Sequence, residues 1–126
     1  MTKEELITRN RKFVIEVFRL MELLPSNRMY DGVIRQLVRS SSSVGANYRA
    51  ACRAKSTADF INKLKIVEEE ADETSYWLDL LESMDNGKNK ESIQGLLKES
   101  NELVSIYSAS LITIKNKVSN SKKRTS

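Results

Sequence analysis

Basic residues without acidic neighbours are the feature of this sequence best suited to bind a ligand. The charged residues between positions 33 and 58 are all basic: Arg35, Arg39, Arg49, Arg53 and Lys55. On a helix, the four arginines fall within an arc of about 80° and along about 27 Å, and we call this row the Arg ridge. Guanidinium groups match phosphate oxygens, so the ridge is a candidate nucleic-acid-binding surface. The alternative is a solvated helix face, because Arg is a good helix former.

A run of acidic residues follows the basic segment. It consists of Glu68, Glu69, Glu70, Asp72 and Glu73. Adjacent positions on a helix point to different faces, so most of these carboxylates cannot converge on a metal ion, and a solvated face is expected. As a further alternative, the run could pair with the Arg ridge of another subunit and help the protein assemble.

The absence of histidine argues against most kinds of catalysis. Without imidazole there is no Ser/His or Cys/His nucleophile pair and no zinc or di-iron motif that uses histidine. Cys52 is the only cysteine, so it cannot form an internal disulfide. We interpret it as a small packing residue of a protein in a reducing compartment. We therefore expect no catalytic residue, metal site or cofactor.

Four apolar stripes with alternating spacings of three and four residues predict the helices that position these side chains. The first stripe includes Phe13, Val17 and Leu20 and stops at Pro25, and the second runs from Tyr30 to Ala51. The third runs from Phe60 to Leu81, and the fourth from Leu97 to Val118. The first predicted helix spans about 3–24, and the second follows the Pro25-Ser26-Asn27 turn and ends near Ala54. The third starts after an N-cap at Ser56 or Thr57 and is broken by Asp85-Asn86-Gly87, and the fourth spans about 90–118. Because the connections are short, we expect an all-α, antiparallel up-down-up-down four-helix bundle.

The chain length of 126 residues fits one domain. We expect residues 1–118 to form the bundle and residues 119–126 to form a basic, disordered tail. No apolar run is long enough to cross a bilayer and no secretion signal is recognisable, so no membrane contact is expected and a cytoplasmic location is predicted.

Large apolar residues also lie outside the core stripes. Around the axes of the first and third helices, they lie about 80 to 140° away from the core stripe. Such residues at the edge of a core are typical of a subunit interface, with a thicker core as the alternative. The predicted oligomer interface comprises Val14, Phe18, Met21, Ile66 and Trp77.

The segment from Arg39 to Leu81 resembles the bacterial four-helix-bundle family of 23S rRNA intervening-sequence proteins. The matching positions are Arg39, Ser43, Val44, Ala46, Asn47, Ser56, Asp59, Phe60, Leu64, Ile66, Glu73 and Leu78. Where the family usually has Pro, this chain has Gly45, and where it has Glu-Gly, this chain has Ala50-Ala51. The bend and the carboxylate of the family pattern are therefore missing.

The resemblance implies a bundle that assembles as a homopentamer without known catalysis. The accessory subunits of diversity-generating retroelements are similar bundles that bind nucleic acid, which by analogy draws attention to the Arg ridge. Among the matching polar positions, Asn47 and Glu73 lie on the flanks of their stripes. We expect them to form a structural cluster with Arg39 that fixes helix register.

Two functions remain open from the sequence. The first is a homo-oligomeric scaffold that binds structured RNA or another nucleic acid through the Arg ridge and Lys55. The second is a protein–protein assembly subunit with no nucleic-acid role.

Overall fold

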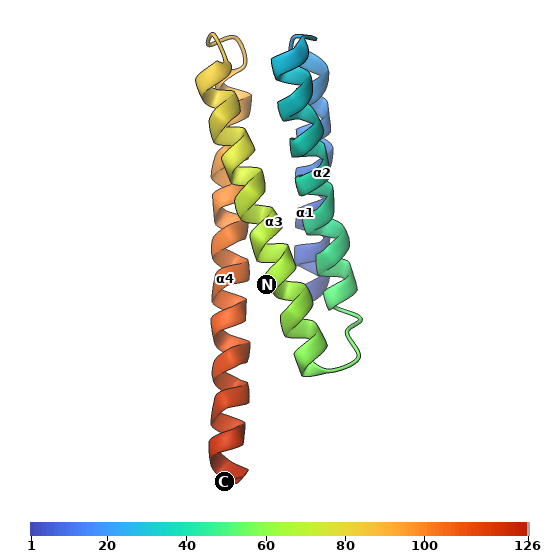
Figure 1. The fold of residues 1–126 in the computed structure, drawn as a ribbon, viewed down its shortest axis with the longest axis vertical. Helices are drawn as coiled ribbons and strands as arrows, with labels where there is room; N and C mark the ends of the chain where they lie inside the picture. Colours follow the sequence, from blue (N-terminus) through green and yellow to red (C-terminus); the bar gives the residue numbers. More distant parts are fainter. Residues whose placement is uncertain (126) are drawn as a thin grey trace.

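Four antiparallel helices make up the computed structural model, which describes residues 1–125 and the side chains of residues 1–123. They are α1 (Lys3–Leu23), α2 (Arg28–Ala51), α3 (Thr57–Met84) and α4 (Lys90–Thr125). Consecutive helices pack side by side into a long rod (Figure 1). No strand occurs among residues 1–125, and the predicted all-α four-helix bundle is confirmed.

Polar residues at the turns fix where the helices begin. The side chains of Thr2, Asn27 and Ser56 each accept a hydrogen bond from a backbone N–H in the first turn of α1, α2 or α3. Between α3 and α4 the chain reverses at Gly87, whose φ of 98° is a conformation that favours glycine. These short connections hold successive helices antiparallel.

The core runs along the centre of the rod and contains most of the predicted stripe positions. Phe13, Leu37, Leu64 and Tyr107 are among its buried members. In α4 the buried positions are shifted by one residue from part of the predicted stripe: Leu96 and Leu103 are buried, whereas Leu97 and Val104 are only half-buried. Leu96 and Leu97 are adjacent apolar residues, and so are Leu103 and Val104. Spacing alone therefore does not decide which residue of each pair faces inward.

Small hydroxyl side chains occupy one level of the core. Ser40 of α2 lies 2.9 Å from Thr74 of α3, and Ser75 of α3 lies 2.7 Å from Ser100 of α4. All four residues are buried. Each hydroxyl therefore has a hydrogen-bond partner away from water.

Two helix ends differ from the prediction. α2 stops at Ala51, not Ala54, because Arg53 and Ala54 form tighter turns with Ala50 and Ala51. α4 continues through residues 119–125, so the expected disordered tail is helical up to Thr125, and no Gly or Pro follows Val118 to stop it. Ser126, the last residue of the expected tail, lies outside the described residues. The final turns of α4 extend beyond the start of α3 (Figure 1).

Candidate nucleic-acid and assembly surfaces

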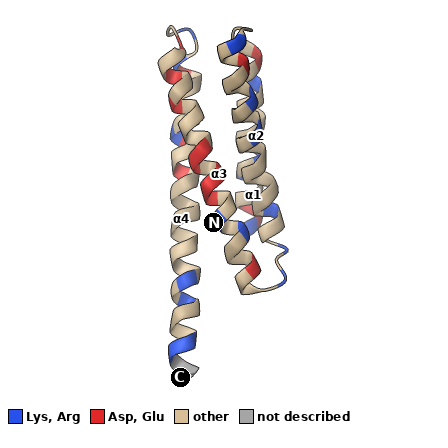
Figure 2. Ribbon diagram, viewed as in Figure 1, with Lys and Arg blue, Asp and Glu red and all other residues tan. Residues whose placement is uncertain are grey.

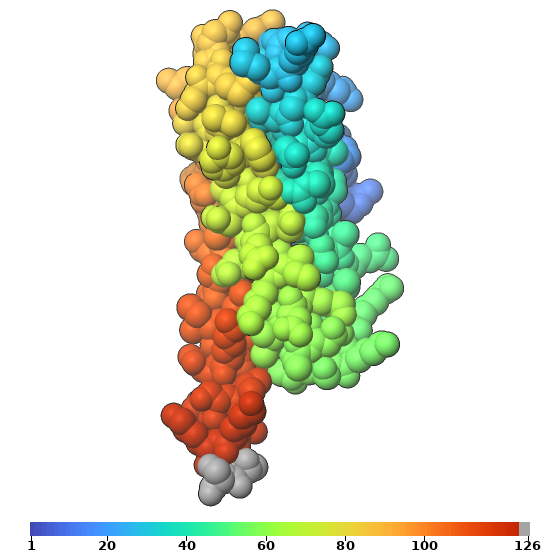
Figure 3. Space-filling view, in the orientation of Figure 1, coloured from blue at the N-terminus to red at the C-terminus, as the bar shows by residue number. Residues whose placement is uncertain are grey.

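The predicted Arg ridge is divided between α2 and the turn that follows it. Arg35, Arg39 and Arg49 are exposed on α2, whereas Arg53 and Lys55 lie in the α2–α3 turn. Side chains at this end of α2 and in the turn stand out from the rod (Figure 3). Within the described part of the chain, the side chains of Arg35, Arg49, Arg53 and Lys55 form no ion pair.

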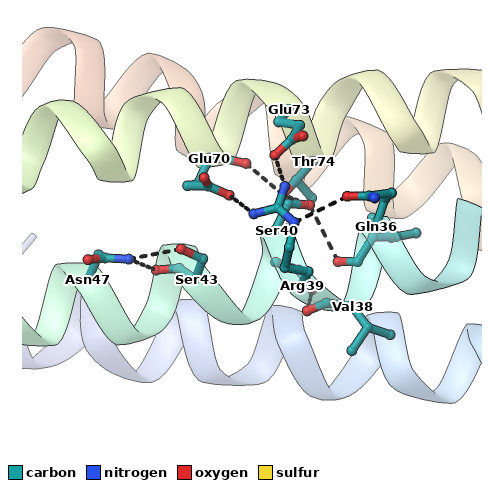
Figure 4. Close-up of polar contacts among 11 residues, drawn as sticks. Gln36, Val38, Arg39, Ser40, Ser43, Asn47, Glu70, Glu73 and Thr74 are labelled. Carbon is teal, nitrogen blue, oxygen red and sulfur yellow. Dashed lines mark hydrogen bonds and ion pairs between the residues drawn. The ribbon is translucent and has the colours of Figure 1, made fainter.

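Arg39 differs from the rest of the ridge because it is held by α3. Its guanidinium lies 3.0 Å from a carboxylate oxygen of Glu70 and also contacts Glu73, and its Nε donates to Gln36 (Figure 4). The hydrogen bond to Glu73 raises the pKa of Arg39. The predicted contact between Arg39 and Glu73 is present, so this arginine serves the α2–α3 contact.

Asn47 does not join that cluster, and this part of the prediction is wrong. Its amide nitrogen donates to the backbone oxygen of Ser43 at 2.9 Å and to the Ser43 hydroxyl at 2.8 Å (Figure 4). Asn47 lies two helical turns beyond Arg39, and its bonds stay within α2. A flanking position on a stripe predicts partial burial but does not identify the partner.

The five predicted interface residues differ in exposure. Phe18 is 42% exposed and Ile66 is 43% exposed. Met21 and Trp77 are half-buried and pack against the core, and Val14 is also half-buried. Among these five residues, Phe18 on α1 and Ile66 on α3 are the most exposed.

A groove of about 400 Å³ runs between α1 and α2 beside Phe18. Five residues of α1 line it: Ile7, Arg11, Val14, Ile15 and Phe18. The α2 wall has the small residues Ser42, Gly45 and Ala46, followed by Arg49. An apolar groove with small residues on one wall allows another helix to approach closely.

Two polar contacts that sequence reasoning missed join α1 to α4. In the core, the Tyr107 hydroxyl donates to the side-chain oxygen of Asn10 at 2.5 Å, and burial raises the pKa of Tyr107, which keeps this donor protonated. The Tyr107 ring lies 5.6 Å from the ring of Tyr48. At the edge of the core, Arg9 contacts Glu99 at 2.5 Å and Glu102 at 2.8 Å.

A signal for Asn10 was present in the sequence. Leu6, Asn10, Phe13 and Val17 follow the same four-three-four spacing, so Asn10 occupies a core position of α1. Its side-chain nitrogen is buried without a hydrogen-bond partner.

Charge is distributed unevenly over the helices. Residues 28–55 carry six basic side chains and one acidic one, whereas α3 carries two basic and eight acidic ones. Acidic residues gather in the middle of α3 (Figure 2). Among the described residues, no group of three potential ligands is arranged to hold a metal ion. None of the helices, over their described residues, is apolar over enough length to cross a membrane.

Four antiparallel helices around one apolar core define an all-α four-helix-bundle protein. The chain belongs to the 23S rRNA-intervening sequence protein family, whose model matches residues 3–109. It is similar to a solved structure from Bacteroides thetaiotaomicron, a protein with unknown function from the S23 ribosomal protein family. The two share 32% sequence identity and a TM-score of 0.74, over 83% of this chain and 96% of the other. Among curated proteins, none matches the chain.

Proposed function

We propose that this protein is a cytoplasmic, non-catalytic, homo-oligomeric scaffold that binds structured RNA along the Arg ridge. The observation that carries the proposal is that four basic side chains on α2 and in the following turn form no ion pair with any described residue: Arg35, Arg49, Arg53 and Lys55. Binding phosphates would compensate these charges and release counterions from the RNA.

The structure changes which residues we assign to the RNA. Arg39 already contacts two carboxylates of α3, so it has less capacity to bind phosphate. Arg49 lines the α1–α2 groove as well as the ridge. We therefore assign the main phosphate contacts to Arg35, Arg53 and Lys55, with Arg49 as a shared position.

RNA is the first polyanion to test because the name of the family refers to intervening sequences of 23S rRNA. Guanidinium forks bind phosphate oxygens in pairs, and a row of them can follow a backbone without reading the bases. The proposed binding therefore recognises backbone geometry.

The experiment compares RNA binding of the wild type with that of an Arg35→Gln/Arg53→Gln/Lys55→Gln variant over a range of salt concentrations. An RNA hairpin with a duplex stem is the probe. We expect about a tenfold or greater loss of affinity near 0.1 M salt and a shallower salt dependence, since fewer counterions are released. The matched control is Arg19→Gln/Lys90→Gln/Lys98→Gln, which removes the same charge at three exposed positions on α1 and α4.

The result is decisive in either direction. If the control weakens binding as much as the ridge variant does, net charge alone explains the affinity and the ridge is not the site. Equal, weak binding by all three proteins contradicts RNA binding altogether.

The second candidate is a protein assembly subunit without a nucleic-acid role. The apolar groove between α1 and α2, with the exposed Phe18 on its wall, favours it, because a contiguous apolar surface is typical of a protein-interaction site. Self-association is common to both candidates, and the family resemblance implies five subunits. Sedimentation of the wild type over a wide concentration range tests it, and a monomer throughout contradicts it.

A further inference from the structure

The outward face of α3 carries apolar and acidic side chains, whose charge is opposite to that of the α1–α2 groove. Ile66 and Tyr76 are 43% and 58% exposed and lie ten residues apart, or about 15 Å on a helix. Between them lie Glu69 and Asp72, which are exposed and form no ion pair with any described residue. We call these four residues the α3 stripe. It is apolar at both ends and acidic in the middle.

The groove carries the opposite charge. Ile7 and Phe18 mark its ends on α1, eleven residues or about 16 Å apart, with Arg11, Val14 and Ile15 between them. Gly45 of α2 faces Asn10 of the antiparallel α1, so Arg49, one helical turn after Gly45, lies towards the Ile7 end. Arg11 and Arg49 are exposed and form no ion pair within the described chain. The groove is therefore apolar along its length and basic towards the Ile7 end.

We infer that the α3 stripe of one copy docks in the α1–α2 groove of the next. In this contact the carboxylates of Glu69 and Asp72 meet the guanidinium groups of Arg11 and Arg49. Ile66 and Tyr76 pack on the apolar side chains of the groove. Opposite charges that meet across an interface fix its register and the orientation of the two partners. The inference rests on the proposed self-association and names the surfaces that carry it.

The small α2 wall makes room for the incoming helix. A side-chain carbon added at Gly45 would meet only the Cβ atom of Asn10, at 4.0 Å, so the fold itself does not require glycine there. Ser42 and Ala46 beside Gly45 also have short side chains, so the backbone of a docked helix can approach α2 closely.

The two surfaces belong to opposite sides of the subunit. α3 lies at the front of the rod and α1 lies behind it (Figure 1). A contact between two different surfaces is head-to-tail, so each copy keeps one free groove and one free stripe until the assembly closes. Repetition therefore leads to a ring if the rotation between copies closes and to a filament if it does not.

Charge reversal tests the contact. An Arg11→Glu/Arg49→Glu variant places four like charges across the interface, and so does a Glu69→Lys/Asp72→Lys variant. Each is expected to weaken self-association by about tenfold or more, because like charges in contact are strongly unfavourable. The variant with all four substitutions restores opposite charges and is expected to assemble like the wild type. Sedimentation gives the oligomeric state, and circular dichroism checks that each variant keeps its helices.

The outcomes separate this inference from the proposed function. A wild type that assembles while neither reversal weakens it overturns the docking of α3 in the groove but leaves self-association intact. Reversals that weaken assembly without rescue in the fourfold variant also overturn the pairing. A wild type that stays monomeric overturns both the docking of α3 in the groove and the proposed self-association. The RNA test uses none of these four residues, so its failure is independent.

Discussion

The seam between α1 and α4 and the seam between α2 and α3 are each bridged by one arginine that contacts two glutamates three residues apart. Arg9 contacts Glu99 and Glu102, and Arg39 contacts Glu70 and Glu73. The surroundings differ. α2 and α3 pack along most of their length, whereas α1 and α4 contact each other least among the neighbouring helices.

Exposure separates the two arginines further. The side chains of Arg9 and Glu99 are 26% and 27% exposed, whereas that of Arg39 is 47% exposed. Water screens the Arg39 contacts more strongly, and the helices it joins are already held by apolar packing. The same arrangement of residues therefore matters more in the seam with less packing, where the Asn10–Tyr107 hydrogen bond adds a buried contact.

The largest effect is expected from Tyr107→Phe, which removes the buried hydroxyl of the α1–α4 seam. The side-chain oxygen of Asn10 then loses its donor in the core, and we expect the free energy of unfolding to fall by about 1–3 kcal/mol. Urea unfolding followed by circular dichroism measures the change. Tyr76→Phe is the control, because Tyr76 is exposed, and it is expected to change stability by less than about 0.5 kcal/mol. Equal effects of the two substitutions would show that the buried bond does not stabilise the seam.

A smaller effect is expected from acid acting on the Arg9 contacts. The hydrogen bond from Arg9 lowers the pKa of Glu99 below its usual value of 4.5. The unfolded chain therefore binds the proton more readily, so this stabilisation is present above about pH 4.5 and is lost as the pH falls through the lowered pKa.

Unfolding measured between pH 7 and pH 3 for the wild type and for Arg9→Gln checks this expectation. The variant is expected to be less stable by about 1 kcal/mol at pH 7 and to lose less stability on acidification. Arg19→Gln is the control, because Arg19 is exposed on α1 and forms no ion pair with any described residue. Parallel pH curves for the wild type and Arg9→Gln would mean that Glu99 is not the responsible group.

The smallest effect is expected from Arg39→Gln in the α2–α3 seam. Exposed ion pairs contribute little, so we expect a loss of about 0.5 kcal/mol or less. A double-mutant cycle with Glu73→Gln isolates the pair. A loss as large as that of Arg9→Gln would contradict the difference between the two seams.

The sequence predicted the number, order and direction of the helices because their apolar spacing is regular over many turns. It was less informative where two adjacent residues are both apolar, as at Leu96 and Leu97. It also missed contacts between distant parts of the chain. Arg9 and Glu99 are 90 residues apart, and local spacing does not indicate that they meet.

The candidate surfaces were predicted in part. The positions of Arg35, Arg49 and Phe18 on exposed faces follow from helical periodicity. That Arg39 is held by α3 depends on how α2 and α3 are aligned along their length, which periodicity leaves open. Arg53 was placed on a helix because no Gly or Pro marks the end of α2.

The level of Ser40, Thr74, Ser75 and Ser100 has a consequence for how the sequence can diverge. Helices that meet through small hydroxyls leave little room for a larger side chain. Ser75 and Ser100 bond to each other, so an apolar replacement of one leaves the other hydroxyl buried without that partner. Thr74 also donates to the backbone oxygen of Glu70, and Ser40 to that of Leu37, so this pair keeps a partner when one hydroxyl is lost. We therefore expect Ser75 and Ser100 to diverge less readily than Ser40 and Thr74.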